Sequence, residues 1–388
     1  MNESIKMKKV CVTTGSRSDY GILSQVMKEI RKSKELELEI VAAGSHLEET
    51  FGYTYKEIER DGFIIDKKVR IPLAFSSNKE MASATGEAVR GFSEAFSEIK
   101  PDLVLVLGDR FEVFAAVIAA YYQLIPVAHI HGGDKSTGGS LDDSVRHAIT
   151  KLSQIHFVAS RKSFERVKKL GEEEHRIHLV GSPAVDMILS TKKISREELN
   201  KKFGLKNEPY TVVIQHPITS NVGEAGAQMR ETMEAVKSIG LQAVVVYPNA
   251  DAGGKKIIEE IEKYSKLPFV KVFKSVPFKD YVQLLMHSSC LVGNSSGALI
   301  ETPSLHIPAV NIGPRQNERE KSENVIDAPH DRREIEAAIR KALFDKEFKK
   351  KVENCKNPYG IGKSSKKIVE ILEKTEINEG LIRKKLAY

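Results

Sequence analysis

Short apolar runs alternate with stretches of helical periodicity along the first half of the chain. The apolar runs are continuous, and the clearest of them is LVLVL at 103–107. Continuous apolar strands separated by helices are typical of a parallel sheet that is covered on both faces. The pattern predicts strands at 9–14, 36–43, 103–107, 126–130, 155–159 and 177–180, and helices at 21–32, 79–99, 111–122 and 142–153.

The same alternation starts again after a charged, helical connector at 195–207. It predicts strands at 211–214, 242–246, 270–272, 290–292 and 309–312, and helices at 227–238, 255–266, 279–288, from Gly297, at 335–343 and at 363–374. We therefore expect an α/β protein of two doubly wound, Rossmann-like domains, at 1–182 and 183–363, with the boundary near Gly181-Ser182-Pro183. Ligands bind beyond the carboxyl ends of the strands in such sheets, so we expect the active site in the interdomain cleft.

Composition changes this picture little. The chain has 388 residues, with 60 Lys and Arg against 53 Asp and Glu, and residues 341–388 hold 13 of the former against 7 of the latter. The rest of the chain is therefore close to neutral, whereas a nucleic-acid-binding protein is expected to carry a basic face on its folded body. We expect no nucleic-acid partner, and we interpret the basic C-terminal segment as a solvated helix.

The three cysteines also exclude some classes of site. Cys11, Cys290 and Cys355 are far apart, and the first two lie in apolar runs. This spacing predicts neither a disulfide framework nor a zinc site. No apolar run approaches the ~18 residues of a membrane span, and the first nine residues lack an apolar signal region. We expect a cytoplasmic protein with no membrane partner.

Polar residues that could carry chemistry follow the strands of the first domain. Gly15–Gly21 (GSRSDYG) follows the first strand, and its Arg17 is suited to phosphate, although an ordinary turn with a surface Arg is the alternative. Asp109 and Arg110 follow LVLVL, where Asp109 could instead be a simple helix cap. These residues are candidates for a ligand site at the end of the sheet.

Two further groups follow the next strand. The cluster His129-Ile130-His131-Gly132-Gly133-Asp134 lies at a strand end, with both histidines on one side of the strand. A metal is one interpretation, but no matching carboxylate and histidine spacing follows on a helix face. Asp142 and Arg146 lie four residues apart on the next helix and form either a helical ion pair or a ligand-facing acid with a phosphate-binding Arg.

The second domain has corresponding residues at its strand ends. Gln215-His216-Pro217 ends one strand, and another runs into Gly293-Asn294-Ser295-Ser296-Gly297. Serines and glycines at a helix N-terminus can bind phosphate. Glu301 could accept both hydroxyls of a ribose, or it could simply favour the helix dipole. Gly313-Pro314-Arg315 brings a further arginine to this edge.

Taken together, these residues resemble the UDP-N-acetylglucosamine 2-epimerases, specifically the hydrolysing branch of the sialic-acid and legionaminic-acid pathways. The resemblance runs from about residue 9 to 372 in seven motifs, in order: GSRSDYG, GDRFE, HIHGGD, LDDSVRHAITK, QHP, GNSSGALIE and GPRQNERE…EN. It implies a glycosyltransferase-B-like fold, UDP bound mainly to the second domain, and a C-terminal helix within 364–388 that packs back on the first. It also implies a homodimer or homotetramer, no cofactor and no metal.

The resemblance also implies roles for individual residues. From the resemblance and the chemistry that it implies, we expect catalysis by Asp109, His131, Asp134, Asp142 and His216. The resemblance assigns binding of the UDP-sugar to Arg17, Asp19, Arg110, Asp143, Arg146, His147, Val276, Tyr281, Asn294, Ser295, Ser296, Gly297, Glu301 and Arg315. Within this set, Val276 would contact uracil through its backbone, Ser295 and Ser296 the phosphates, and Glu301 the ribose.

The motif HIHGGD departs from the family pattern. Many members read HIEGGE, so His131 replaces a glutamate to which acid–base work is often assigned. A histidine here is similar to relatives that act on UDP-2,4-diacetamido-2,4,6-trideoxyglucose. We therefore expect a hydrolysing 2-epimerase that acts on UDP-N-acetylglucosamine or, alternatively, on this diacetamido sugar. A glycosyltransferase of the same fold is a further alternative for the function.

The reaction that the resemblance implies explains the kinds of residue present. The C2 proton of the sugar becomes acidic only if the C1–O bond to UDP breaks and C1 gains oxocarbenium character. Arginines, serines and a helix N-terminus can stabilise the departing diphosphate. Groups that transfer protons would then allow elimination to 2-acetamidoglucal, followed by addition of water to give UDP and N-acetylmannosamine.

Overall fold

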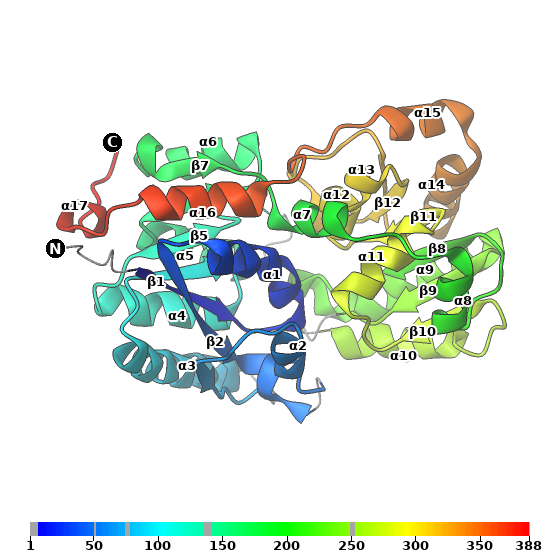
Figure 1. Ribbon diagram of the computed structural model, residues 1–388. Helices are drawn as coiled ribbons and strands as arrows, with labels where there is room; N and C mark the ends of the chain where they lie inside the picture. Colours follow the sequence, from blue (N-terminus) through cyan, green and yellow to red (C-terminus); the bar gives the residue numbers. More distant parts are fainter. Residues whose placement is uncertain (1–6, 50–51, 74–77, 136–140, 249–252, 388) are drawn as a thin grey trace. The chain divides into compact units, whose positions relative to one another are not determined.

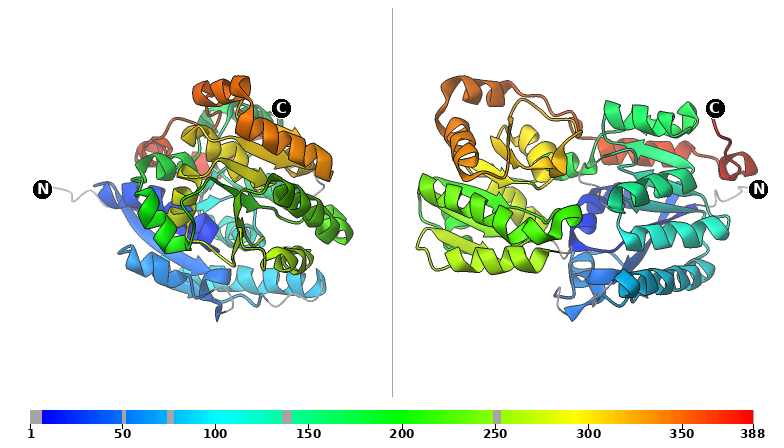
Figure 2. Two further views of the ribbon diagram at one scale, coloured as in Figure 1. Left: turned by 90° about the vertical axis from the view of Figure 1, so that its right-hand side faces the viewer. Right: turned by 180° about the vertical axis from the view of Figure 1, so that it is seen from behind.

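The protein is described from a computed structural model that covers residues 7–49, 52–73, 78–135, 141–248 and 253–387. The chain divides into two compact units. The first unit holds Met1–Asp134, Asp142–Met187 and Gly362–Tyr388, and the second holds Lys135–Leu141 and Ile188–Ile361. Figures 1 and 2 show that each unit is a central sheet flanked by helices.

The first unit contains a seven-stranded sheet in the order β3-β2-β1-β4-β5-β6-β7. Every neighbouring pair in it is parallel. Its strands are β1 (Lys8–Thr14), β2 (Leu36–Ala43), β3 (Lys67–Val69), β4 (Leu103–Leu107), β5 (Val127–Ile130), β6 (Ile155–Val158) and β7 (Ile177–Leu179). The order reverses between β1 and β4, which is where doubly wound sheets bind their ligands.

Alternate residues of these strands face two different helix layers, so both faces of the sheet are buried. Val10 and Val12 pack with one layer, which includes α1 (Arg17–Lys32), α2 (Tyr55–Arg60) and α16 (Ser364–Lys374). Cys11 packs with the other layer, which includes α3 (Asn78–Ile99), α4 (Phe111–Tyr122) and α5 (Leu141–Leu152). This arrangement explains why the strands read as continuous apolar runs. The remaining helices of this half are α6 (Arg161–Lys169), α7 (Pro183–Ser190) and α17 (Glu379–Ile382).

The second unit repeats the design with a six-stranded parallel sheet in the order β10-β9-β8-β11-β12-β13. Its strands are β8 (Tyr210–Ile214), β9 (Gln242–Val246), β10 (Val270–Phe273), β11 (Cys290–Gly293), β12 (Ala309–Ile312) and β13 (Val325–Ala328). Its helices are α8 (Arg196–Phe203), α9 (Ala225–Ile239), α10 (Gly254–Tyr264), α11 (Phe278–Met286), α12 (Gly297–Ile300), α13 (Thr302–Leu305), α14 (Arg332–Phe344) and α15 (Lys346–Asn354). The order reverses between β8 and β11.

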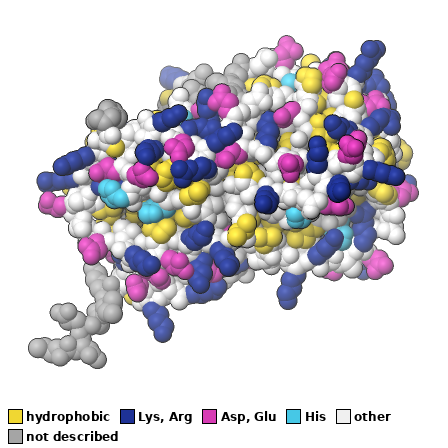
Figure 3. Space-filling model, turned by 90° about the horizontal axis from the view of Figure 1, so that it is seen from above, with side chains coloured by type: hydrophobic (Ala, Val, Ile, Leu, Met, Phe, Trp, Pro, Cys, Tyr) yellow, Lys and Arg dark blue, Asp and Glu magenta, His cyan; other side chains and the backbone are white. Residues whose placement is uncertain are grey.

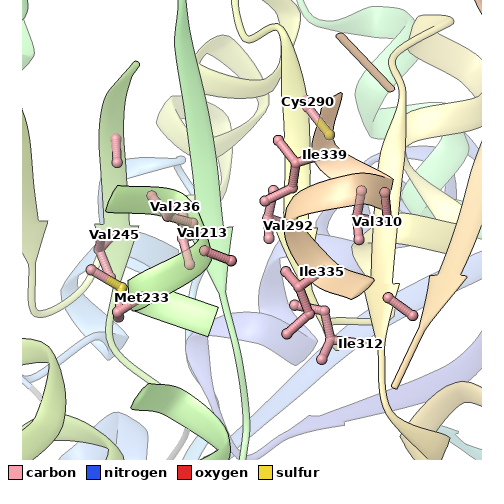
Figure 4. Close-up of a cluster of buried hydrophobic side chains, with 14 of the residues drawn as sticks. Val213, Met233, Val236, Val245, Cys290, Val292, Val310, Ile312, Ile335 and Ile339 are labelled. Atoms are coloured by element: carbon pink, nitrogen blue, oxygen red, sulfur yellow. The ribbon is translucent and has the colours of Figure 1, made fainter. Parts of the chain in front are cut away.

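One hydrophobic cluster holds this second sheet to its helices. Val213 and Val292 from the strands pack against Met233 of α9 and Ile335 and Ile339 of α14 (Figure 4). Each of these five side chains is at most 1% exposed. Fully burying a side chain of this size contributes about 1.5–3 kcal/mol, so this cluster is a principal source of stability for the unit.

The expected class of fold, two doubly wound parallel α/β domains, is confirmed. Several elements were not predicted, among them β3, β13, α6, α7 and α15. The turn predicted at Gly15–Gly21 is shorter than expected, because Ser16 caps α1 by accepting a hydrogen bond from the Asp19 N–H, and the helix begins at Arg17. The helix predicted from Gly297 is two short helices, α12 and α13, with Glu301 between them.

The interpretation of the basic C-terminal segment as a solvated helix is wrong. Ile368 and Leu372 of α16 are buried in the same cluster as residues of α1. Beyond α16, the ammonium group of Lys384 donates to Glu172 Oε2 at 2.7 Å and to the carbonyl of Ser153 at 2.7 Å. Arg176 binds the same segment by donating to the carbonyls of Gly380 and Leu381. The segment is therefore an integral part of the first unit.

Lys and Arg side chains are interspersed with Asp and Glu over the face drawn in Figure 3, and no large area of that face carries one sign only. This distribution agrees with the near-neutral composition of the chain outside its C-terminal segment. Among the described helices, none is both long and apolar enough to cross a membrane.

Candidate active site

Arg146 organises the acidic residues at the carboxyl end of the first sheet. It lies on α5, is 5% exposed, and forms an ion pair with Asp109 in the loop after β4. Its Nη1 donates to the backbone carbonyl of Asp134 at 2.7 Å and to Asp143 Oδ1 at 3.3 Å. One guanidinium thus joins the loops that follow β4 and β5 to α5.

This arrangement decides between the alternatives for Asp109. Arg110, and not Asp109, is the N-cap residue of α4, and α4 has no side-chain cap. The carboxylate of Asp109 is bound to Arg146 and remains about one-fifth exposed. The helix-cap interpretation is therefore wrong. His147 follows Arg146 on α5, and Asp142 lies in the first turn of that helix with its side chain outside the described part of the structure.

Asp134 is more enclosed than Asp109. It is 4% exposed, and its Oδ1 accepts a hydrogen bond from Ser163 Oγ at 2.7 Å. Gly133, just before it, has a φ of 76°, and a Cβ there would collide with the backbone carbonyl of Ser163. The glycine therefore lets the loop after β5 lie directly on α6, and this contact fixes the position of Asp134.

The two histidines of HIHGGD have different surroundings. His129 is fully buried, its Nε2 donates to the carbonyl of Gly108 at 2.8 Å, and burial lowers its pKa to about 3. His131 has a φ of 65°, in the left-handed region that non-glycine residues seldom occupy, and its Nε2 lies 2.9 Å from Ser182 Oγ. In the described ranges no group of three or more His, Cys, Asp or Glu could hold a metal ion. His129 is therefore a structural residue that supports the loop after β4. His131 lies at the end of strand β5 and remains the candidate catalytic histidine of this motif.

Arg17, Asp19 and Arg110 lie at the point where the strand order reverses. Arg17 forms an ion pair with Glu57 of α2. Burial raises the pKa of Asp19 to about 6, with a further increase from Glu112, while Arg110 opposes the shift. This part of the first unit therefore holds two arginines and a buried carboxyl group whose pKa is raised to about 6.

The corresponding point of the second unit is held together by Asn294. This side chain follows β11, accepts from the His216 N–H at 2.7 Å and donates to the His216 carbonyl at 2.9 Å. Gly293, with a φ of 132°, is required there because a Cβ would overlap the carbonyl of Ile214. Asn294 therefore positions the loop that carries His216, and its side chain already has partners on both sides.

Two buried side-chain oxygens without hydrogen-bond partners in the described part of the chain lie beside Gly297. Tyr281 Oη of α11 and Glu301 Oε2 are buried and have no hydrogen-bond partner among the residues that the structure describes. Both lie so close to Gly297 that a Cβ on this residue would collide with them. Burial raises the pKa of Glu301 to about 7 and raises that of Tyr281 well above its ordinary value. The carboxylate of Glu301 can accept hydrogen bonds from the hydroxyl groups of a ligand, and the hydroxyl group of Tyr281 can donate one.

The remaining predicted residues of the second unit lie in the segments that follow β10, β11 and β12. Ser296 is the N-cap residue of α12, and Ser295 Oγ accepts from the Gly297 N–H at 3.3 Å. Arg315 lies in η5 (Pro314–Gln316) and donates to the carbonyl of Asn294 at 3.2 Å. Val276 lies in the loop between β10 and α11.

Sequence reasoning missed several residues that position these groups within each unit. Ser163, Ser182 and Gln316 hold Asp134, His131 and the carbonyl of Asn294, respectively. Each comes from an element whose packing a single sequence does not reveal. Glu112 was also missed, although the motif GDRFE contains it.

Comparison with known proteins identifies the family. Residues 28–373 match the family model described as UDP-N-acetylglucosamine 2-epimerase. The chain belongs to the UDP-N-acetylglucosamine 2-epimerase family. It is 37% identical to a UDP-N,N'-diacetylbacillosamine 2-epimerase (hydrolyzing) from Legionella pneumophila, over 98% of this chain and 100% of the relative. It is 33% identical to a UDP-N-acetylglucosamine 2-epimerase from Neisseria meningitidis serogroup B, over 87% of this chain and 88% of that one.

The fold comparison agrees with this family assignment. A UDP-GlcNAc 2-epimerase from Neisseria meningitidis, solved bound to UDP-GlcNAc, superposes with a TM-score of 0.81 at 23% identity, over 95% of this chain and 100% of that one. The 2-epimerase fold seen here is thus of the glycosyltransferase-B-like type, as the resemblance implied. At this identity the likeness establishes the fold alone.

Proposed function

We propose that this family member is a hydrolysing 2-epimerase that converts a UDP-2-acetamido sugar into UDP and the free 2-epimeric sugar. The observation that carries the proposal is the cluster that Arg146 forms with Asp109, Asp143 and the backbone of Asp134. Charged groups at a strand end are costly to bury unless they are used or paired, and this cluster keeps one carboxylate partly exposed.

The unpartnered oxygens beside Gly297 support the nucleotide half of the proposal. A ribose presents two adjacent hydroxyl groups, and a carboxylate such as that of Glu301 can accept hydrogen bonds from both. The N-terminus of α12 with Ser295 and Ser296 is short, but it adds N–H and hydroxyl donors for phosphate. We propose that the second unit binds UDP in this way.

We propose that residues of the first unit act on the sugar. Arg17 and Arg110 stabilise the diphosphate as the C1–O bond breaks, because charge develops on the leaving group. Asp109 and His131 transfer the protons at C2 and at the attacking water, one on each face of the sugar. Asp134, which accepts a hydrogen bond from Ser163, orients the loop after β5.

Two sugars are candidates for the substrate. UDP-N-acetylglucosamine is the donor expected from the motifs as a set. UDP-2,4-diacetamido-2,4,6-trideoxyglucose, which is UDP-N,N'-diacetylbacillosamine, is favoured by His131 and by the 37% identity to the Legionella relative with that printed specificity. The second sugar differs at C4 and C6 only, so the same chemistry at C1 and C2 serves both.

Proton NMR of the purified protein with each donor in D2O tests this proposal. We expect free UDP and a 2-epimeric sugar that carries deuterium at C2, because the C2 proton is removed and replaced from solvent. An intact, deuterated UDP-sugar would assign the chain to the non-hydrolysing reaction. If neither donor reacts, but sugar is transferred when an acceptor is added, the result would favour a glycosyltransferase.

A further inference from the structure

Glu112 is a buried carboxylate for which the proposed reaction has no assigned use. It lies in the first turn of α4, two residues after Arg110, and is 1% exposed. A carboxylate is seldom enclosed to this degree without a positively charged partner or a functional requirement. The contacts of the Glu112 side chain with neighbouring residues indicate its role.

Glu112 accepts a directed hydrogen bond from Arg110. Its Oε1 accepts a hydrogen bond from Arg110 Nε at 2.6 Å, while about one-third of the Arg110 side chain remains exposed. Nε is the inner nitrogen of the guanidinium group. Since the group is planar and rigid, a bond at Nε fixes the direction in which the two terminal nitrogens point.

The neighbouring backbone is shaped around Glu112. Gly15, after β1, does not have a positive φ, yet a Cβ on it would collide with the Glu112 side chain. Gly44, after β2, would place a Cβ 3.6 Å from Glu112 Oε1, and Ser45 closes this side by donating to the Gly15 carbonyl at 2.8 Å. The ends of β1, β2 and β4 thus meet around one carboxylate, and Gly15 is a glycine for reasons of space.

The electrostatics also connect Glu112 to the binding residues. Its Oε2 is buried and has no hydrogen-bond partner within the described ranges. Together with burial, its charge raises the pKa of Asp19, and Arg110 opposes this effect. A buried ion pair contributes little net stability compared with apolar packing, so stability alone is a poor reason for this arrangement.

We propose that Glu112 is a positioning residue that directs Arg110 toward the diphosphate of the substrate. This inference rests on the proposed function, in which Arg110 stabilises the departing UDP. Glu112 does not touch the substrate. It acts by holding the guanidinium of Arg110 in one orientation, and Gly15 leaves the room that this requires.

A double-mutant cycle with Arg110 tests the inference. Steady-state kcat and KM are measured with the donor that the wild type turns over, for Glu112→Ala, Arg110→Ala and the double variant. Loss of a hydrogen-bond partner that orients a metal ligand typically costs about 10- to 100-fold in activity, and by analogy we expect a loss of this size in kcat/KM for Glu112→Ala. In the Arg110→Ala background we expect a change within about twofold, because Glu112 then has nothing to orient.

Three further variants separate positioning from folding. Glu112→Gln keeps an acceptor oxygen of the same shape, so we expect it to fold and to lose less activity than Glu112→Ala. Gly15→Ala displaces the Glu112 side chain and should reproduce part of the loss. Gly86→Ala is the matched control, since a Cβ there meets nothing within 4 Å, and its activity should equal that of the wild type.

The outcomes distinguish this inference from the proposed function. Equal losses from Glu112→Ala with and without Arg110 would overturn the positioning role, as would full activity of both Glu112 variants. If the wild type turns over neither donor, the proposed function fails. The same cycle is then measured on the affinity for UDP-N-acetylglucosamine by calorimetry, where additive losses would again overturn the inference.

Discussion

At the scale of single residues, Glu301, the proposed ribose ligand, is a buried carboxyl group with a raised pKa. Its pKa of about 7, against an ordinary 4.5, results from burial. Between these values the folded protein holds a proton that the unfolded chain has released, so this residue makes the free energy of unfolding fall as the pH rises from about 4.5 to 7. The unliganded protein therefore carries the cost of a buried carboxylate above pH 7.

A ligand that donates hydrogen bonds to Glu301 should relieve this cost. We expect the affinity for UDP to rise with pH up to about 7, and Glu301 can contribute at most about a tenfold rise per pH unit. We also expect the binding of UDP below pH 7 to release a proton from Glu301. Isothermal titration calorimetry between pH 5.5 and 8, in buffers of different ionisation enthalpy, measures both quantities.

Two variants isolate the contribution of Glu301 from that of the UDP phosphates, which also titrate. Glu301→Gln should remove this part of the pH dependence and weaken binding above pH 7. Glu259→Gln alters an exposed glutamate on α10 and should behave like the wild type. A pH dependence that is the same in all three proteins would exclude Glu301 as a ribose ligand.

At the scale of elements, the C-terminal segment is attached to α5 through a buried charge cluster. Glu172 is 1% exposed, accepts hydrogen bonds from Lys384 and from His156 at 3.0 Å, and forms an ion pair with Lys151 at 2.7 Å. Burial opposes the ionisation of Glu172, but these contacts outweigh it and lower its pKa to about 2. Lys384 also donates to the carbonyls of Thr150 and Ser153 at the end of the helix that carries Arg146.

Lys384→Met should remove this attachment. We expect the free energy of unfolding at pH 7 to fall by about 1–3 kcal/mol, the usual cost of losing hydrogen bonds to a charged group. The contribution of Glu172 is present above pH 4.5 and is lost as the pH falls toward 2, so the difference from the wild type should shrink over that range. Urea unfolding followed by circular dichroism measures it.

The neighbouring lysine provides the control. Lys385 has an exposed side chain, so Lys385→Met should leave stability unchanged within about 0.5 kcal/mol. If both variants lose the same amount, a loss of net charge rather than the contact of Lys384 with Glu172 would be the cause.

At the scale of the whole molecule, two units with separate cores are joined by a chain that leaves the first unit and returns to it. α16 packs its Ile368 and Leu372 into the core of the first unit, although some 170 residues of the second unit precede it. The stability of the first unit therefore depends on a segment that is synthesised last.

Leu372→Ala tests this dependence. Removing a large buried side chain costs about 2–5 kcal/mol, and we expect the cost to fall on the first unit. Hydrogen exchange measured by mass spectrometry should show faster exchange in α1 and β1 and unchanged exchange in β8 and α9. Leu343→Ala, in the core of the second unit, should show the reverse pattern, and equal acceleration in both units would contradict the division.

The sequence by itself determined the fold class, because apolar periodicity is a local property. The run LVLVL must be buried on both faces, and the helix that follows it has no polar face to expose. The elements that were missed are those whose local signal is weak: β3 and β13 are edge strands of three and four residues, and α15 is dominated by lysines. The start of α1 was also misplaced, at Gly21 instead of Arg17, because the cap at Ser16 depends on one hydrogen bond.

The sequence also identified the strand ends that hold polar residues, since glycines, acids and arginines after apolar runs are visible in one dimension. Only the tertiary structure decided how those residues are paired. Asp109 belongs with Arg146, 37 residues away, and Asn294 with the backbone of His216, 78 residues away. These pairs depend on which strands are neighbours in the sheet, and strand order follows from the packing of whole elements. For the same reason the C-terminal segment, which its charge predicted to be solvated, is held by the buried side chains of α16 and by the contacts of Arg176 and Lys384.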